Sequence, residues 1–79
     1  MKIRNNVALS DSGFLFNPSS GDSYSLNETG LFIVHCLQNN KSEDEIIKEV
    51  TKEYMIEKGS FEKDFYDFKK LMESFNLID

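Results

Sequence analysis

Apolar residues are distributed differently in the two parts of this chain, and the change falls within residues 26–30. Up to Leu26 they come singly or alternate, separated by Ser, Asn, Asp and Gly. After Gly30 they recur at the three- and four-residue spacing of helices. Asn27 can accept hydrogen bonds from the free amides that open a helix, and Glu28 places a negative charge where the helix dipole favours one. The pattern therefore predicts strands first, helices afterwards, and a strand-to-helix joint between them.

Three short strands are predicted before the joint. Residues 7–9 and 14–16 flank a turn in which Gly13 can adopt a positive φ. Residues 17–22 form the clearest loop, because the proline in it cannot donate to a sheet ladder. Residues 23–26 alternate polar and apolar side chains, which suits a strand in a sheet with one buried face.

The first helix after the joint covers residues 28–37 and is apolar on nearly every side. Such a helix belongs in the centre of a small fold. Asn39 and Asn40 follow it, and asparagine tolerates the left-handed conformation that closes a helix. The sequence therefore predicts a central helix that ends at this pair.

Two further helices follow. Ser42 and Glu45 have the spacing of a capping box, which opens an amphipathic helix that runs to about Tyr54. Ser60 is predicted to cap a third helix that ends at residue 74 or 75, after which residues 76–78 fold back over the helix end. The apolar stripe of the third helix consists of Phe61, Phe65, Phe68, Met72 and Phe75, widened by Leu71. Residues 1–79 are thus predicted to form one α+β domain, a winged-helix-like three-stranded antiparallel sheet followed by three helices.

Composition narrows the classes of protein that this chain can be. With 79 residues it can build one small core, so a large internal active-site cavity is not expected. No apolar run is long enough to span a bilayer, and the N-terminus shows no signal-peptide pattern. Cys36 is the single cysteine, which excludes an internal disulfide. We therefore expect a cytoplasmic protein that makes no membrane contact.

Residues with catalytic or metal-binding chemistry are few. His35 and Cys36 are neighbours on a helix, so their side chains point about 100° apart and do not face each other. A zinc site needs about four ligands, and the chain has no glycine-rich phosphate loop or nucleophile motif. A buried small residue is the simpler interpretation of Cys36. The sequence thus predicts no enzyme activity, no metal site and no cofactor.

The net charge of −5 arises entirely within residues 42–79. A winged-helix-like arrangement suggests a DNA-binding transcriptional regulator as the alternative function. Nucleic-acid binding, however, draws most of its affinity from cations that meet phosphates. The third helix carries more carboxylates than cations: Glu62, Asp64, Asp67 and Glu73 against Lys63, Lys69 and Lys70. This balance disfavours nucleic acid. The aromatic stripe of the third helix is broad enough to leave part of its surface open for a partner, so a small adaptor that binds another protein there is a further alternative.

A combination of three segments resembles the PqqD-like family: Leu26-Asn27-Glu28-Thr29-Gly30, the apolar helix and polar turn that follow, and the helix that starts with Ser42-Glu43-Asp44-Glu45-Ile46-Ile47 and closes on Tyr54. Modules of this family are the recognition elements for precursors of ribosomally synthesised and post-translationally modified peptides (RiPPs). The resemblance covers about residues 7–78. The chain departs from the family pattern at Asn39-Asn40, where a glycine-containing turn is frequent, and at Asn76, where a Gly-Leu pair is common.

The resemblance implies non-catalytic binding of the leader segment of a precursor peptide, which adds as an extra strand beside the third strand. It also implies a separate partner enzyme, such as a radical-SAM enzyme, a cyclase or a leader peptidase. The implied docking edge consists of Asp22, Ser23, Tyr24, Ser25 and Leu26, and the implied groove wall of Phe65, Phe68, Lys69 and Met72. Lys69 is expected to meet a carboxylate of the leader.

Overall fold

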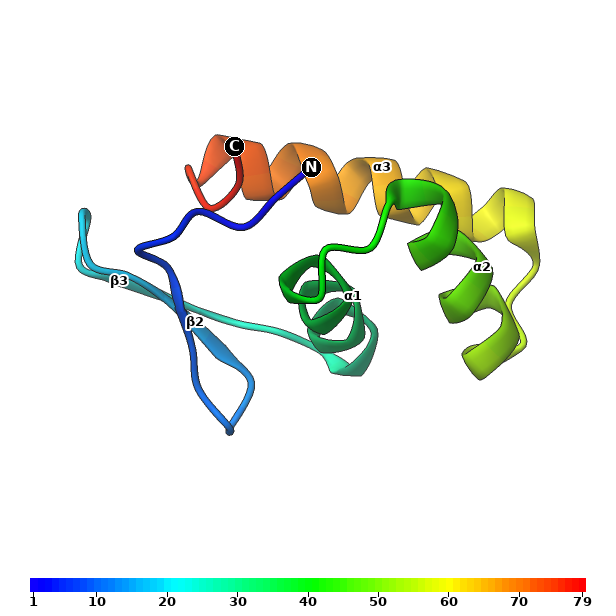
Figure 1. The fold of residues 1–79 in the computed structure, drawn as a ribbon, viewed down its shortest axis with the longest axis horizontal. Coiled ribbons are helices and arrows are strands. Elements are labelled where there is room, and N and C mark those ends of the chain that lie inside the picture. The colour runs from blue at the N-terminus through cyan, green and yellow to red at the C-terminus, as the bar shows by residue number, and fades with distance from the viewer.

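The strands precede the helices in the structure, as the apolar pattern predicts. The computed structural model describes residues 1–79 (Figure 1). The elements are β1 (Ala8–Leu9), β2 (Phe14–Asn17), β3 (Asp22–Ser25), α1 (Glu28–Gln38), α2 (Glu43–Tyr54) and α3 (Lys58–Ser74). The predicted α+β fold, with three antiparallel strands followed by three helices, is confirmed.

The sheet has the order β1-β2-β3, so β2 lies in the middle and β3 is an edge strand. Both pairs of neighbouring strands are antiparallel, and Leu15 of β2 lies opposite Tyr24 of β3. Leu15 is fully buried, whereas Phe14 and Phe16 on the other face are 48% and 41% exposed. One face of the sheet therefore packs on the helices, and the other carries two accessible aromatic rings.

The predicted first strand is one residue too long. β1 contains only Ala8 and Leu9, because the amide of Val7 donates to the carbonyl of Arg4 at 3.1 Å rather than to the sheet. The turn that follows agrees with the prediction, since Gly13 adopts a φ of 88°.

α1 begins at the predicted joint. The side-chain oxygen of Asn27 accepts a hydrogen bond of 2.7 Å from the amide of Gly30, which caps the helix. At the other end, Asn40 has a φ of 60°, the left-handed conformation expected there. Figure 1 shows α1 between the sheet and α2, and Ile33 and Val34 are among its buried residues. The prediction of a central helix is confirmed.

α2 opens with the predicted capping box. The hydroxyl of Ser42 accepts from the amide of Glu45 at 3.2 Å, and the amide of Ser42 donates to the carboxylate of Glu45 at 3.0 Å. Ile46 and Val50 are fully buried. The helix ends at Tyr54 and is capped by Met55, a non-glycine residue in the left-handed conformation with a φ of 52°.

α3 begins earlier than predicted, and Ser60 is not its cap. The helix starts at Lys58, and the hydroxyl of Ser60 lies within the first turn, where it donates to the carboxylate of Glu57 at 3.0 Å. The prediction was wrong because the first residues of the helix are exposed. The apolar stripe starts only at Phe61, and it therefore does not reveal the extra turn.

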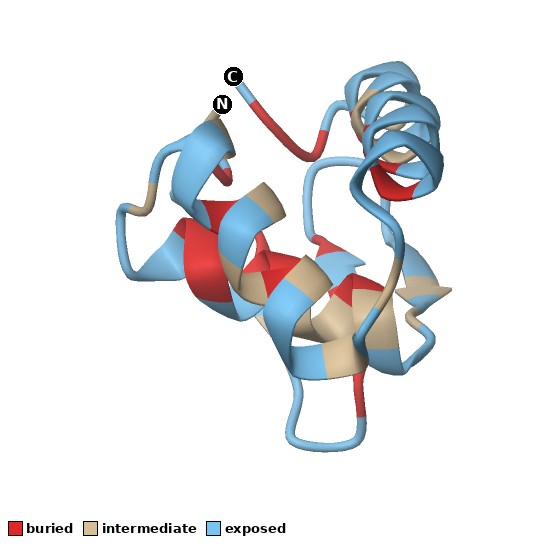
Figure 2. Ribbon diagram, turned by 90° about the vertical axis from the view of Figure 1, so that its right-hand side faces the viewer, coloured by how far each residue is buried: buried red, intermediate tan, exposed pale blue.

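Residues 76–78 fold back over the end of α3, as predicted. Asn76 adopts a φ of 57°, and the amide of Leu77 donates to the carbonyl of Met72 at 3.0 Å. An isolated bridge joins Ile78 to Ile3, so the two ends of the chain lie together beside α3 (Figure 1). Figure 2 shows the buried segments turned to the inside of the fold. None of the helices combines the length and the apolarity that crossing a membrane requires.

Candidate functional site

The outer edge of β3 has no neighbouring strand. The amide of Leu26 donates to the carbonyl of Gly13 at 2.9 Å, which fixes the direction of the backbone groups in this part of the sheet. Because these directions alternate along a strand, Tyr24 also bonds toward β2, and Ser23 and Ser25 turn their N–H and C=O groups outward. β3 therefore offers two residues whose backbone groups can pair with an additional strand.

An apolar groove of about 440 Å³ lies between this edge and α3. Eight of its eleven lining residues are hydrophobic, and none is charged. The lining consists of Leu15, Ser23, Tyr24, Ser25, Leu26, Asn27, Phe68, Leu71, Met72, Phe75 and Leu77. The groove thus follows the open edge of the sheet and can accept apolar side chains next to it.

Two close contacts position α3 along the groove, one with β3 and one with α1. The ring of Tyr24 stacks on that of Phe75 with their centroids 4.4 Å apart. At the other end of the groove, Gly30 of α1 lies so close to Phe68 that a Cβ on the glycine would be 3.3 Å from the ring. Leu71, which is 52% exposed, lies between these contacts on α3 and leaves the groove open to solvent.

The structure brings together most of the residues that the sequence placed at the site. Asp22 is the first residue of β3 and is exposed, but it does not line the groove. The six predicted residues that do line it are Ser23, Tyr24, Ser25, Leu26, Phe68 and Met72. Strand and helix thus meet as expected, whereas the binding role of these residues stays a prediction.

Phe65 and Lys69 lie away from the groove, so their predicted place in its wall is wrong. Phe65 is 3% exposed and stacks on Phe61 at a centroid distance of 5.8 Å, because its position on α3 faces the core. The ammonium of Lys69 lies 3.0 Å from the carboxylate of Glu43 on α2, and this ion pair turns it to the other side of α3.

Five lining residues were missing from the predicted site: Leu15, Asn27, Leu71, Phe75 and Leu77. Leu71 and Phe75 belong to the apolar stripe of α3, so a signal for them exists in the sequence. The breadth of the stripe hides which part of it the core covers. Leu15 and Leu77 come from β2 and from the C-terminal tail, and only the folded chain places them here.

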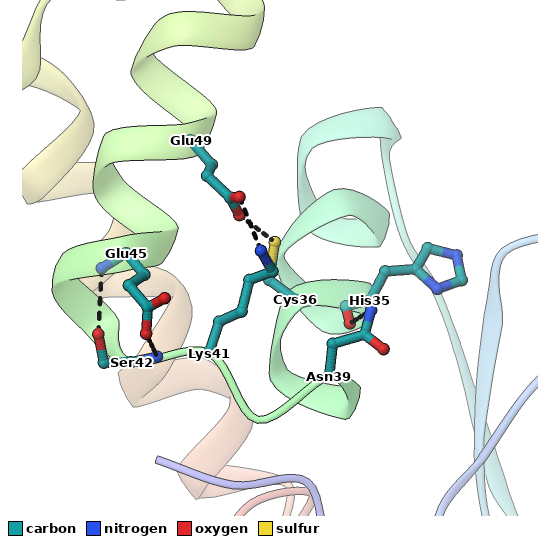
Figure 3. Close-up of polar contacts among 7 residues, drawn as sticks. All are labelled: His35, Cys36, Asn39, Lys41, Ser42, Glu45 and Glu49. Atoms are coloured by element: carbon teal, nitrogen blue, oxygen red, sulfur yellow. Dashed lines mark hydrogen bonds and ion pairs between the residues drawn. The ribbon is translucent and has the colours of Figure 1, made fainter.

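His35 and Cys36 do not line the groove. Figure 3 shows Cys36 together with Lys41 and Glu49. The thiol of Cys36 donates to Glu49 at 3.6 Å, and Lys41 pairs with the same carboxylate at 2.7 Å. Burial and the hydrogen bond to Glu49 raise the pKa of the Cys36 thiol, which makes it a poor nucleophile at neutral pH. The ring of His35 points away from this cluster (Figure 3). No group of three His, Cys, Asp or Glu side chains is placed to hold a metal ion.

Comparisons with known proteins agree with this geometry. No curated protein sequence matches the chain. A solved structure described as "TbiB1 in Complex with the TbiA(beta) Leader Peptide" is similar, with 26% sequence identity and a TM-score of 0.90, over 100% of this chain and 95% of that one. Residues 13–78 match the family model described as "Coenzyme PQQ synthesis protein D (PqqD)". Since this match extends from β2 to the tail after α3, the chain belongs to the PqqD family.

Proposed function

We propose that this protein binds the leader segment of a RiPP precursor by β-strand addition and presents it to a separate enzyme. The observation that carries the proposal is the unpaired edge of β3 beside an apolar groove. In the similar structure, TbiB1 is in complex with the TbiA(beta) leader peptide. Proteins of the PqqD family bind peptides and are not catalysts.

In this proposal the leader lies along β3 as a fourth strand. Its backbone pairs with the outward N–H and C=O groups of Ser23 and Ser25, which provides affinity that depends little on sequence. Every second leader side chain enters the groove, since side chains alternate along a strand. Specificity then depends on how well these side chains fill the space between β3 and α3.

The proposed binding residues follow from this arrangement. Asp22, Ser23, Tyr24, Ser25 and Leu26 form the edge, and Phe68, Leu71, Met72 and Phe75 form the wall and floor. Phe65 and Lys69 act from behind the wall, because Phe65 is buried in the core and Lys69 pairs with Glu43 of α2, and both contacts hold α3 in place.

We further propose that the bound leader is delivered in the cytoplasm to a modifying enzyme, such as a radical-SAM enzyme or a cyclase, or to a leader peptidase. The apolar groove contains no cation for a phosphate. It therefore gives no support to the alternative of a DNA-binding regulator.

The proposal is tested by titrating the labelled protein with synthetic leader peptides of the short precursor genes that neighbour its own gene. We expect backbone amide shifts at residues 22–26 and along α3 from Phe68 to Phe75. Saturable binding that moves neither segment would contradict strand addition, and the absence of binding by every neighbouring leader would contradict the proposed function.

A further inference from the structure

The apolar groove does not end at Phe68. A second depression of about 240 Å³ adjoins it and shares Asn27 and Phe68 in its lining. This depression continues toward the start of α3, between that helix and α1, and is lined by Asn27, Thr29, Gly30, Ile33, Ile56, Phe61, Asp64 and Phe68. The two depressions form one path, which we call the extended groove, from Phe75 past Phe68 to Asp64.

Asp64 is the single charged residue that lines the extended groove. It takes part in none of the four ion pairs of the structure. Its neighbours one helical turn away are Ser60, Phe61, Asp67 and Phe68, so no lysine on α3 stands where it could pair with it. The carboxylate is therefore uncompensated at the end of an apolar path.

Three of the four lysines of α3 have other partners, and the fourth, Lys63, lines neither depression. Lys69 pairs with Glu43 at 3.0 Å and Lys58 with Glu62 at 3.8 Å, while the ammonium of Lys70 lies 5.0 Å from the centre of the Tyr66 ring. None of these cations lines the extended groove. Its charge is thus acidic, in a chain whose net charge is already −5.

We infer that the leader bound by this protein carries a lysine or arginine next to its apolar anchor residues, and that this cation meets Asp64. The inference rests on the proposed function and names the chemistry of its ligand. The cation lies at the end of the added strand that passes Asn27, where its aliphatic stem covers the ring of Phe68 and its charged end reaches the carboxylate. The predicted position of Lys69 in the groove wall implied a carboxylate on the leader, whereas Asp64 calls for a cation on it.

The experiment starts from a random library of twelve-residue peptides displayed on phage and selected on the 79-residue protein. We expect selected peptides to carry apolar residues at alternate positions and one Lys or Arg at a constant distance from them. A selected peptide is then synthesised with its cation and with Gln in its place. The cation is expected to improve the affinity about threefold to fivefold, and 1 M salt is expected to remove most of this gain.

Two variants test the residue. In Asp64→Asn the Lys and Gln peptides should bind within about 1.5-fold of each other, because the pairing charge is gone. Glu73→Gln is the matched control, because it also removes one carboxylate from α3 but Glu73 lines neither depression. This variant should keep the full preference for the peptide with the cation. Asp64→Lys should reverse the preference and favour a peptide with Glu in place of the cation.

The outcomes separate this inference from the proposed function. Selected peptides that shift the amides of residues 23–26 but show no preference for a cation overturn the inference and leave strand addition standing. The inference is also overturned if the Asp64→Asn variant keeps the full preference of the unsubstituted protein for the peptide with the cation. If no selected peptide shifts those amides, strand addition itself fails. Amide spectra of the free variants, expected to match the unsubstituted protein, show that each is folded.

Discussion

At Gly30 the fold requires the absence of a side chain. A Cβ there would lie 3.1 Å from the side-chain oxygen of Asn27 and 3.3 Å from the ring of Phe68, and both distances are tighter than ordinary contacts. The same residue donates its amide to Asn27 at 2.7 Å. Gly30 thus allows the cap of α1 and the wall of the groove to approach each other, which explains a glycine inside a helix, where it otherwise costs stability.

We therefore expect Gly30→Ala to displace Phe68 and to strain the cap at Asn27. An alanine normally stabilises a helix by about 1 kcal/mol relative to glycine, and here the crowding should cancel that gain or reverse it. Gly59→Ala on α3 is the matched control, because its Cβ would meet only the flexible end of the Glu57 side chain. Thermal unfolding and the ring signals of Phe68 measure the effect. Equal stabilisation by both substitutions would refute this account of Gly30.

At the scale of single elements, β3 has two kinds of amide. That of Tyr24 faces β2, in line with the amide of Leu26 just after the strand, which donates to Gly13, whereas that of Ser25 faces outward. Ser25→Pro removes an outward donor and should leave the sheet intact. We expect it to weaken leader binding about two- to tenfold, the range of one lost hydrogen bond.

Calorimetric titration of a leader peptide measures this loss, with Ser25→Ala as the control that keeps the amide. Tyr24→Pro provides the opposite reference, because it removes an amide that bonds within the sheet and should unfold the protein. If Ser25→Pro also unfolded the protein, the assignment of inward and outward amides would be incorrect.

The start of α2 connects stability to pH. The hydrogen bonds from the amide and side chain of Ser42 hold the pKa of Glu45 below its ordinary value. A carboxyl whose pKa is lower in the folded state stabilises the fold above the unfolded-state pKa, which is about 4.3 for glutamate. That contribution is lost as the pH falls through the lower, folded-state value.

We accordingly expect the melting temperature to fall between about pH 5 and pH 3, and to fall less in Glu45→Gln. Glutamine can keep the capping bond to Ser42 but does not titrate in this range. Glu53→Gln, which removes an exposed charge outside the capping box, is the control. Melting curves at each pH in constant salt give the measurement. Identical pH profiles for Glu45→Gln and the unsubstituted protein would disprove the contribution of Glu45 to the pH dependence.

How far the elements could be predicted depends on which physical signal marks them. The capping box of Ser42 and the cap at Asn27 are local, so the starts of α2 and α1 were found. The start of α3 was missed because its first turn is exposed and carries no side-chain cap. Helical spacing put Phe68 and Met72 on the stripe that lines the groove, but it could not show that Phe65 faces the core.

At the scale of the whole molecule, the two ends of the chain complete the fold. Arg4 donates its amide to the carbonyl of Leu77 at 3.0 Å, and Ile3 bridges to Ile78. These residues belong to the 14-residue core cluster or lie next to it. The sequence indicated that the tail folds back, but its contact with the N-terminus joins segments more than 70 residues apart, which no local pattern encodes.

Leu77 lines the groove and Ile78 does not, so the tail gives a test that separates stability from binding. Ile78 is 4% exposed, and Ile78→Ala should cost about 2–4 kcal/mol, a large share of the stability of a chain of this size. Because the groove keeps its lining, the folded fraction should still bind a leader peptide within about twofold of the original affinity. Urea unfolding and peptide titration below the melting transition provide the two measurements.

Leu77→Ala is the comparison variant, because Leu77 is also buried but lines the groove. This substitution should lower both the stability and the affinity for the leader peptide. A loss of affinity in Ile78→Ala as large as that in Leu77→Ala would mean that the ends of the chain shape the groove as a unit.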